Sequence, residues 1–345
     1  MIRVACIGTG NWGKALVRVF DGLEGVRLLY CCDLSLERLK SLQVKTSGCQ
    51  NVTDYRKVIY DEKVDAVIIA TRSGAHYTIA KESLLAGKHT FVEKPLAMEI
   101  KQAEELVQLA EKMNRKLMVG HLLLHHPAIE KMKQLIEGGE LGNIYYVYSQ
   151  RVNLGTIRSD ENALSSFAPH DVSAALYLLE EFPDEVSAQG ECYLQKGIHD
   201  VVFLTLRFSN KKMAQIHLSW LDPQKERKIT VVGNKKMAVF DDTNPREKLR
   251  IYDKGAEVLR NFDSYGEYIS IRSGDVQVPQ IVNTEPLKRE CLHFIDSIRF
   301  NRVPLTDGYN GLQVTKIIEA AQKSLADQGR MVKLTQEEFV IRDSS

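Results

Sequence analysis

Short apolar runs alternate with amphipathic stretches along the first third of the chain. The runs typical of β-strands are Ile2–Ile7, Val26–Cys32, Val64–Ala70, His89–Val92 and Lys116–Gly120. The stretches with helical spacing between them are Lys14–Leu23, Ser35–Leu42, His76–Leu85 and Ile100–Met113. Because strands that alternate with helices in this way form parallel sheets covered on both faces, the pattern predicts a doubly wound α/β domain.

The pattern changes after Gly120. An amphipathic helix is expected at Pro127–Glu137, a strand at Ile144–Val152, and a helix at His170–Leu179 that Pro169–Asp171 would begin. Runs of strand character with hairpin-like spacing follow at Glu185–Tyr193, Val201–Phe208, Met213–Leu218, Lys228–Val232 and Met237–Asp241. We therefore predict a second, α+β domain with a large, mainly antiparallel sheet.

The last quarter of the chain has a polar segment and two helical patterns. Ser264–Pro279 is expected to be a long surface loop, and Leu287–Phe300 and Gly311–Asp327 are expected to be closing helices. The 345 residues exceed what one hydrophobic core usually fills, so two domains are expected.

Composition narrows the classes of partner. The chain is 44% hydrophobic and 26% charged with a formal net charge of +1, so no global attraction to nucleic acid or anionic membrane is expected. No apolar stretch approaches the ~20 residues of a membrane span, and no signal peptide precedes Ile2. The six cysteines show no CxxC pair and no metal spacing. We expect reduced, structural cysteines and a soluble, cytoplasmic protein.

A glycine-rich turn follows the first strand. It has the G-x-G-x-x-G pattern and comprises Gly8, Thr9, Gly10, Asn11, Trp12 and Gly13, with Asp33 20 positions further on at the end of the second strand. This context predicts a Rossmann dinucleotide site, with the pyrophosphate on the helix N-terminus. A carboxylate at Asp33 accepts from the ribose hydroxyls and repels a 2′-phosphate, which favours NAD over NADP. The domains are therefore expected at 1–121, for the dinucleotide, and at 122–345, for the substrate and oligomerisation.

The tripeptide Glu93-Lys94-Pro95 follows the strand that ends at Val92, at the carboxyl edge where α/β sheets place their ligands. A lysine at that edge can donate to a substrate hydroxyl or relay its proton. On these three residues alone, an exposed lysine paired with Glu93 is an equally good interpretation.

With the glycine turn, the E-K-P tripeptide and a downstream histidine, the chain resembles the Gfo/Idh/MocA oxidoreductases over nearly its whole length. The matching segments are Gly8–Gly13, Asp33, Thr71-Arg72, Ala86–Pro95, Leu141–Ile144 and Pro304–Gly311. The resemblance implies that Lys94 contacts the reacting hydroxyl and the nicotinamide region. It implies further cofactor contacts at Thr71, Arg72, His76 and Glu93, and a homo-oligomer, dimer or tetramer, formed through the open face of the large sheet.

The family's second motif usually reads Asp, three residues, His. Here His170 matches the histidine and is the expected general acid/base, since an imidazole accepts a proton at neutral pH. Ser166 stands where the family commonly has aspartate, which changes how Lys94 and His170 divide the work. Asp171 is able to orient the histidine or to cap the helix.

Further segments point to the substrate. The candidate substrate-binding residues in these segments are Asn153, Arg158, Trp220, Lys225 and Arg227. The segments resemble those of the family branch that oxidises nucleotide-linked sugars at C3. A diphosphate needs local cations, although exposed arginines and lysines are often only solvated. The expected substrate is UDP-N-acetylglucosamine, oxidised to the 3-keto sugar as in amino-sugar or lipid A synthesis.

Three histidines lie between the predicted domains. His121 and His125 are spaced i, i+4, but they lack the carboxylate of an H-E-x-x-H site, and Pro127 predicts that Leu122–His126 is extended. We expect no metal and assign His121 and His125 to the substrate pocket.

Alternative substrates are UDP-N-acetylglucosaminuronic acid, a free sugar or an inositol. An alternative of another class is a dinucleotide-binding sensor that has lost catalysis, against which Lys94 and His170 both argue.

Overall fold

The structure is a computed structural model that describes residues 1–42, 44, 48–258 and 269–335. The chain divides into two compact units. Unit 1 comprises Met1–His125 and Thr284–Lys316, and unit 2 comprises His126–Asn283 and the described residues from Ile317 onward. The C-terminal segment therefore contributes to both units, whereas a single change of domain after residue 121 is what the sequence predicts.

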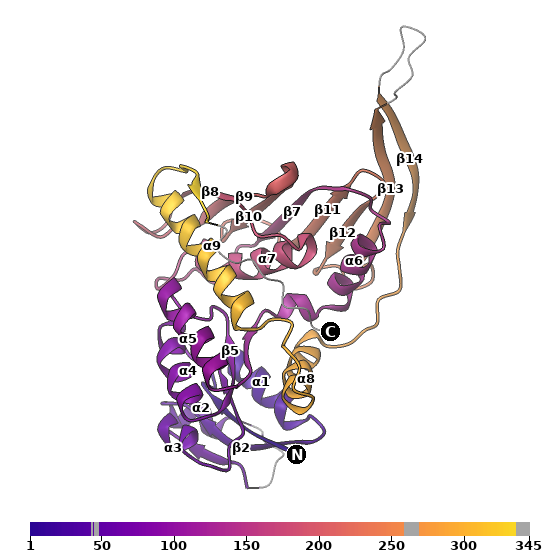
Figure 1. The fold of residues 1–345 in the computed structure, drawn as a ribbon. Helices are drawn as coiled ribbons and strands as arrows, with labels where there is room; N and C mark the ends of the chain where they lie inside the picture. The colour runs from indigo at the N-terminus through magenta and orange to yellow at the C-terminus, as the bar shows by residue number, and fades with distance from the viewer. Residues whose placement is uncertain (43, 45–47, 259–268, 336–345) are drawn as a thin grey trace, which may run out of the picture. The chain divides into compact units, whose positions relative to one another are not determined.

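Within the described residues, unit 1 is built on six parallel strands (Figure 1). The strands are β1 (Ile2–Ile7), β2 (Val26–Cys32), β3 (Gln50–Val52), β4 (Ala66–Ile69), β5 (His89–Glu93) and β6 (Leu117–Gly120). Their order is β3-β2-β1-β4-β5-β6. The connections change direction between β1 and β4, and in such sheets ligands bind at the carboxyl ends of the strands beside this switch point. The predicted doubly wound fold is confirmed.

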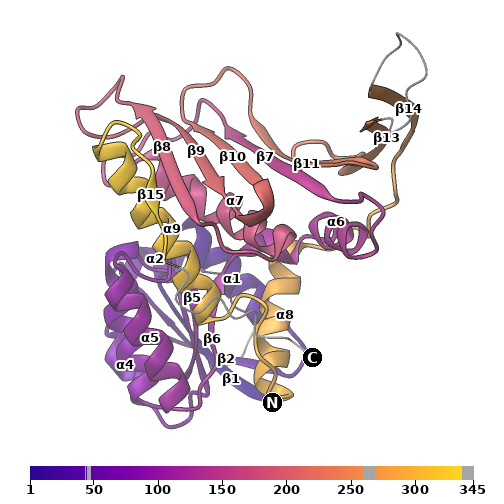
Figure 2. The same cartoon turned by 45° about the horizontal axis from the view of Figure 1, so that its top comes forward.

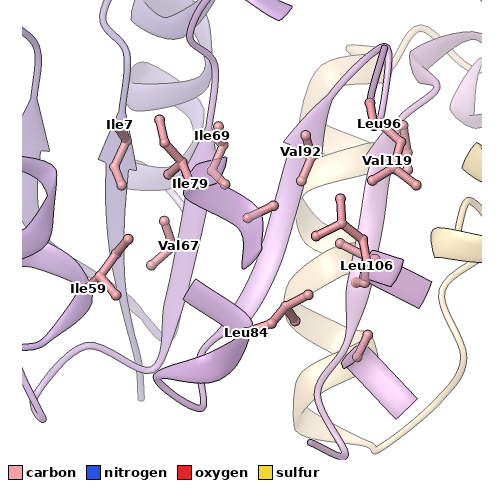
Figure 3. Packing of buried hydrophobic residues seen from close by; sticks show 14 of the residues in the cluster. Ile7, Ile59, Val67, Ile69, Ile79, Leu84, Val92, Leu96, Leu106 and Val119 are labelled. Carbon is pink, nitrogen blue, oxygen red and sulfur yellow. The ribbon is translucent and has the colours of Figure 1, made fainter. Parts of the chain in front are cut away.

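Helices cover both faces of this sheet. They are α1 (Asn11–Asp21), α2 (Leu36–Lys40), α3 (Tyr55–Ile59), α4 (His76–Leu85), α5 (Ile100–Lys112) and α8 (Pro286–Arg299). Alternate strand residues serve the two faces: Ala5 and Ile7 pack with α3, α4 and α5, whereas Val4 and Cys6 pack with α1, α2 and α8. Figure 3 shows the first cluster, in which Ile69, Val92 and Val119 of neighbouring strands meet Leu84 and Leu106.

Helix α8 covers the same face of the sheet as α1 and α2, although it comes from the last quarter of the chain. Its stripe Leu287, Cys291, Phe294 and Ile295 is buried in the same core as Phe20 of α1 and Phe91 of β5. The rings of Phe20, Phe91 and Phe294 meet edge to face, with centroids 5.7 to 6.5 Å apart. The predicted closing helix is therefore part of the dinucleotide-binding unit.

Unit 2 contains a mixed, mostly antiparallel sheet of nine described strands (Figure 2). Its strands are β7 (Ile144–Val152), β8 (Glu185–Glu191), β9 (Val201–Arg207), β10 (Met213–Ser219), β11 (Glu226–Gly233), β12 (Met237–Asp241), β13 (Leu249–Val258), β14 (Ile269–Gln277) and β15 (Val332–Lys333). The order is β14-β13-β12-β11-β7-β10-β9-β8-β15, and only the β7–β10 pair is parallel among these described neighbours. The α+β prediction is confirmed.

One face of the large sheet carries helices and the other is open. Helix α7 (Ala163–Leu179) packs on β7, β9 and β10, and α6 (Pro127–Glu137) packs on β12. The long helix α9 (Gly308–Ala326) begins in unit 1 and ends in unit 2. On the open face Tyr146 and Phe203 are exposed, and Phe203 stacks on His217 at a ring distance of 4.4 Å. Aromatic side chains in contact on an open sheet face are a candidate protein contact.

Two local predictions are wrong. The segment Ser264–Pro279 does not form one loop, because Ile269–Gln277 is strand β14, paired antiparallel with β13; residues 264–268 lie outside the described residues. At the edge of the sheet β14 is stabilised by its backbone pairing rather than by burial, since Ile271 and Val276 are exposed. The Leu122–His126 segment is a 3₁₀ helix, η2 (Leu122–His125), because Pro127 restricts only His126, which is extended.

The helix around His170 is longer than the sequence predicts. Helix α7 begins at Ala163, where the side chain of Asn162 accepts a hydrogen bond from Ser165 N–H, and Pro169 lies inside it. An interior proline costs about 3 kcal/mol, but most of this helix is buried, so packing outweighs the lost hydrogen bond. His170 and Asp171 are therefore mid-helix residues, and the capping role considered for Pro169–Asp171 is wrong.

All six cysteines are free thiols, and the Cys31 and Cys49 sulfurs lie 3.9 Å apart across β2 and the start of β3. None of the helices in the described residues is long and apolar enough to cross a membrane.

Candidate active site

The glycine turn joins β1 to α1, and its three glycines do not all serve the same purpose. Gly8 has a φ of +91°, and a Cβ on it would stand 2.4 Å from the Ala70 carbonyl oxygen. A Cβ on Gly13 would stand 2.1 Å from the carbonyl oxygen of Gly8. By contrast, a Cβ on Gly10 would meet no atom within 4 Å among the described residues. Gly8 and Gly13 therefore serve internal packing, whereas Gly10 leaves open space outside the turn.

Asp33 is tied to this turn. Its Oδ2 accepts hydrogen bonds from the Thr9 N–H at 2.8 Å and the Thr9 hydroxyl at 3.0 Å, and its Oδ1 accepts from the Ser35 N–H at 2.9 Å. Partial burial alone would raise the pKa of Asp33, but the hydrogen bonds from Ser35 and Thr9 outweigh burial and lower it. The carboxylate is thus ionised, with Arg38 Nη1 3.8 Å from Oδ1.

The residues present fit a dinucleotide. The open space beside Gly10, the N-terminus of α1 and an ionised carboxylate at the end of β2 are the three features that hold a pyrophosphate and a ribose. Gly10 is the N-cap of α1 and has no side-chain cap, so its neighbouring N–H groups remain for a ligand. Asn11 begins the helix there, and Thr71 and Arg72 follow β4 at the same edge of the sheet.

Glu93 ends β5 and links the tripeptide Glu93-Lys94-Pro95 to the glycine turn. Its Oε1 accepts a hydrogen bond from the indole Nε1–H of Trp12, and its Oε2 accepts from the Lys94 N–H at 3.3 Å. Gly120 is its partner on β6, where a Cβ would stand 3.0 Å from the Glu93 carboxyl atoms. Burial raises the pKa of Glu93 to about 7, against the lowering effect of Trp12 and Lys94.

His76 connects two of the loops at this edge. Its Nδ1 lies 2.8 Å from the Pro95 carbonyl oxygen and its Nε2 lies 3.1 Å from the Thr71 carbonyl oxygen. Burial lowers the pKa of His76, although both carbonyl contacts act in the opposite direction. The imidazole is therefore neutral and carries one N–H, so it donates a hydrogen bond to one of these two carbonyl oxygens, while its ring lies between the turn that follows Lys94 and the turn that follows β4. The Lys94-Pro95 peptide bond is cis.

In unit 2, His170 is half-buried on α7 and Ser166 is buried one helical turn before it. The next residue, Asp171, is buried on the sheet side of the helix. It accepts from Arg151 Nε at 2.6 Å and from the Ser149 hydroxyl at 2.6 Å. This buried ion pair fixes α7 on β7, and hence fixes the part of the helix that carries His170. Sequence reasoning singled out Asp171 but missed Arg151 and Ser149, which the alternation of β7 places on one face.

The predicted substrate residues of unit 2 have varied surroundings. Arg158 is ion-paired with Glu161, and Arg227 Nη1 lies 3.5 Å from Asp242 Oδ2. Lys225 is exposed and forms no ion pair within the described residues. Asn153 is half-buried at the end of β7. Trp220 is 1% exposed and packs edge-on against Phe167, so its ring belongs to the core of the unit.

The histidines after β6 lie in unit 1. His121 and His125 are buried, and the His125 ring lies 5.1 Å from the ring of His293 on α8. Burial lowers the pKa of His125 to about 3, so this imidazole is neutral. Within the described part of the chain, no group of three or more His, Cys, Asp or Glu side chains is arranged to hold a metal ion.

Comparison with known proteins agrees with this architecture. Residues 2–121 match the model of the oxidoreductase family with an NAD-binding Rossmann fold, GFO_IDH_MocA, and residues 129–239 match the GFO/IDH/MocA C-terminal domain. The uncharacterized oxidoreductase YrbE of Bacillus subtilis is 25% identical over 94% of both chains. Myo-inositol 2-dehydrogenase of Thermotoga maritima is 24% identical, covering 96% of this chain and 98% of its own.

A third relative is UDP-N-acetylglucosamine 3-dehydrogenase of Acidithiobacillus ferrooxidans, 24% identical over 91% of this chain and 94% of its own. A solved structure of the enzyme of that name and organism has a TM-score of 0.78 at 22% identity, covers 95% of this chain and 98% of its own, and has the same fold. The two domain matches, together with the glycine turn, Asp33 and the tripeptide at the end of β5, show that this chain belongs to the Gfo/Idh/MocA family of NAD-binding oxidoreductases.

Proposed function

We propose that the protein oxidises a secondary alcohol on the ring of a sugar or sugar-like polyol, with NAD⁺ as the hydride acceptor. The observation that carries the proposal is the hydrogen bond between Trp12 of the glycine turn and Glu93. It ties the residue before Lys94 to the turn that fits the cofactor's pyrophosphate. When bound, the cofactor supplies a two-electron acceptor for the hydrogen on the alcohol carbon.

The proton of the alcohol is handled by the chain's own residues. Lys94 binds the reacting oxygen and stabilises its alkoxide character, and His170 accepts the proton as general base. Asp171 and Arg151 hold the helix segment of His170, while His76 holds the loop of Lys94. The proposed cofactor contacts are Gly8–Gly13, Asp33, Thr71, Arg72 and Glu93. Ser166 stands at the position commonly occupied by aspartate, so the motif lacks its second charged group. Binding and stabilisation of the reacting oxygen therefore depend more on Lys94.

For the substrate, we propose UDP-N-acetylglucosamine as the first candidate, oxidised at its C3 hydroxyl. Two observations support it: the similarity to a UDP-N-acetylglucosamine 3-dehydrogenase over most of both chains, and the exposed Lys225 as a cation for a diphosphate. Another observation favours an inositol as the second candidate. Arg158 and Arg227 are already paired with carboxylates, and an uncharged polyol needs no additional cation.

The test is a panel of UDP-sugars, free sugars and inositols with NAD⁺, followed by NADH absorbance. Lys94→Ala should lose most of the rate, about 10²-fold or more, while NADH still binds. Lys101→Ala, an exposed lysine on α5, is the matched control and should keep the rate. Near wild-type turnover by Lys94→Ala would refute the assignment. NADH binding without turnover on any alcohol would instead favour the sensor hypothesis.

We also propose a homo-oligomer that works in the cytoplasm, where the six cysteines stay reduced. The open face of the large sheet, with Tyr146 and Phe203, supports contact between copies. Light scattering on the purified protein should give a multiple of 39.1 kDa, and Phe203→Glu should lower it. A monomer at working concentration would contradict this part of the proposal.

A further inference from the structure

Helix α8 buries an acid that has no role so far. Glu290 is 0% exposed, and within the described residues neither of its carboxyl oxygens has a hydrogen-bond partner. An ionised carboxylate in that position would forfeit its hydration with no donor in exchange, which proteins avoid by keeping such a group protonated. Glu290 stands in the apolar stripe of its helix, between Leu287 and Phe294, which is the sequence signal for an acid in the core.

The register of β5 against α8 places this acid beside Glu93. Phe91 on β5 packs against Phe294 on α8 with ring centroids 5.7 Å apart. Glu93 lies two residues after Phe91 on the strand, and Glu290 lies four residues before Phe294 on the helix. Both steps keep the same face of the element. Burial first, and then the charge of Glu93, raises the pKa of Glu290 well above its usual range, so the two groups are close enough to interact.

The hydrogen-bond donors decide which acid carries the charge. Glu93 receives the Trp12 indole N–H and the Lys94 backbone N–H, and Glu290 receives neither. A carboxylate is stabilised by donors, so the negative charge belongs on Glu93 and the proton on Glu290. Two carboxyl groups in one buried cluster do not both ionise near neutral pH, because each charge opposes the other.

The other titratable and charged groups around the pair come from every neighbouring element. They are Lys94 after β5, Cys6 on β1, Glu285 before α8 and Cys291 on α8; a separate neighbouring group contains His121, His125, Arg289 and His293. Burial raises the pKa of the Cys291 thiol and lowers those of His125 and His293, so these three groups are neutral around pH 7. Because burial raises the pKa of Glu93 to about 7, the charge of Glu93 changes near neutral pH.

We propose that Glu93 and Glu290 form a buried acid pair in which Glu290 stays protonated, while Glu93 exchanges one proton with solvent when the cofactor changes between NAD⁺ and NADH. The inference rests on the proposed function, which puts the reacting end of the cofactor at Lys94. The nicotinamide ring of NAD⁺ carries a positive charge that NADH lacks. Ionised Glu93 therefore favours binding of NAD⁺. When NADH replaces NAD⁺, Glu93 takes up a proton and becomes neutral.

The linkage gives a direction that binding alone can test. As pH falls through the titration of Glu93, NAD⁺ loses an attractive charge and the ratio Kd(NAD⁺)/Kd(NADH) rises. If the cofactor shifts the pKa of Glu93 by one unit, the ratio changes about tenfold across the titration. We would measure both constants by NADH fluorescence and NAD⁺ competition from pH 5.5 to 8.5, without substrate.

Four variants separate the pair from its surroundings. Glu93→Gln should make the ratio independent of pH. Glu290→Gln, which replaces one neutral group by another, should keep the wild-type dependence. Glu285→Gln, an exposed acid at the start of the same helix, is the matched control and should also keep it. Circular dichroism confirms that each variant is folded. His170→Gln, tested alongside, should keep the dependence, which excludes the general base as its source.

Infrared spectroscopy gives a readout that needs no cofactor. The carbonyl stretch of a protonated carboxylic acid should persist in the wild type at pH 8.5 and disappear in Glu290→Gln. A flat ratio in the wild type, or loss of the dependence in Glu290→Gln but not in Glu93→Gln, would overturn the inference. A flat ratio in an enzyme that oxidises its alcohol leaves the proposed function intact. A pH-dependent ratio with no alcohol oxidised refutes the proposed function alone.

Discussion

Adding one methyl group at Gly10 or at Gly13 should separate cofactor binding from folding. At Gly10 the φ is −63° and no described atom lies within 4 Å of the new Cβ, so alanine fits without strain. The folded state then keeps its stability, or gains about 0.4–1 kcal/mol because the unfolded chain loses freedom. At Gly13 the Cβ would stand 2.1 Å from the carbonyl oxygen of Gly8. Since a carbon and an oxygen need about 3.3 Å, α1 must move by more than about 1 Å.

The assay is urea unfolding without cofactor, combined with NADH fluorescence titration. Gly13→Ala should lower the free energy of unfolding by about 1–3 kcal/mol, the usual cost of overpacking, and weaken NADH binding as well. Gly10→Ala should leave the unfolding midpoint in place and raise the Kd for NADH at least about tenfold, a loss of about 1.4 kcal/mol, because its methyl group fills the space for the pyrophosphate. If Gly10→Ala binds NADH as the wild type does, the glycine turn does not hold the cofactor. An unchanged midpoint in Gly13→Ala would show that the packing argument is wrong.

Three other predictions concern stability and its dependence on pH. Asp33→Asn should unfold at a lower urea concentration than the wild type at pH 7. Because the folded-state pKa of Asp33 is lowered, its carboxylate stabilises the fold above about pH 4, and the difference between the two proteins should shrink as pH falls through that folded-state pKa. A constant difference from pH 7 to pH 3 would contradict the assignment. Arg151→Leu, which leaves the buried Asp171 without its cation, should cost about 3–5 kcal/mol in urea unfolding, while the exposed Arg227→Leu should cost less than about 1 kcal/mol; similar losses would refute the distinction. Trp220→Ala should lower the free energy of unfolding by about 3–5 kcal/mol, as expected for a fully buried ring, and a variant of wild-type stability would show that the ring does not belong to the core.

The hydrophobic pattern predicts the longer elements of unit 1 closely, because both kinds of element there bury a regular stripe, but it misses the short strand β3 and the short helix α3. Strands β1 and β2 and helix α4 have the bounds that the pattern predicts. The pattern fails for β14, whose apolar side chains Ile271 and Val276 are exposed and form no buried stripe, and for the start of α7. In α7 a proline that usually begins a helix lies inside one, because burial of the whole helix outweighs the local preference.

The sequence alone predicts the cofactor site, because the G-x-G-x-x-G pattern and Asp33 stand at the required spacing at the ends of two neighbouring strands. A Cβ on Gly13 would collide with Gly8 inside the turn, and a Cβ on Gly8 would collide with Ala70 after β4, whereas Gly10 leaves open space. Only the tertiary structure decided which charges are paired and which polar groups are buried. Asp171 is paired with Arg151 and Arg227 with Asp242, and Glu290 is buried on α8, where we propose that it pairs with Glu93. Burial and long-range pairing depend on how distant elements pack, and that information is not contained in any one stretch of residues.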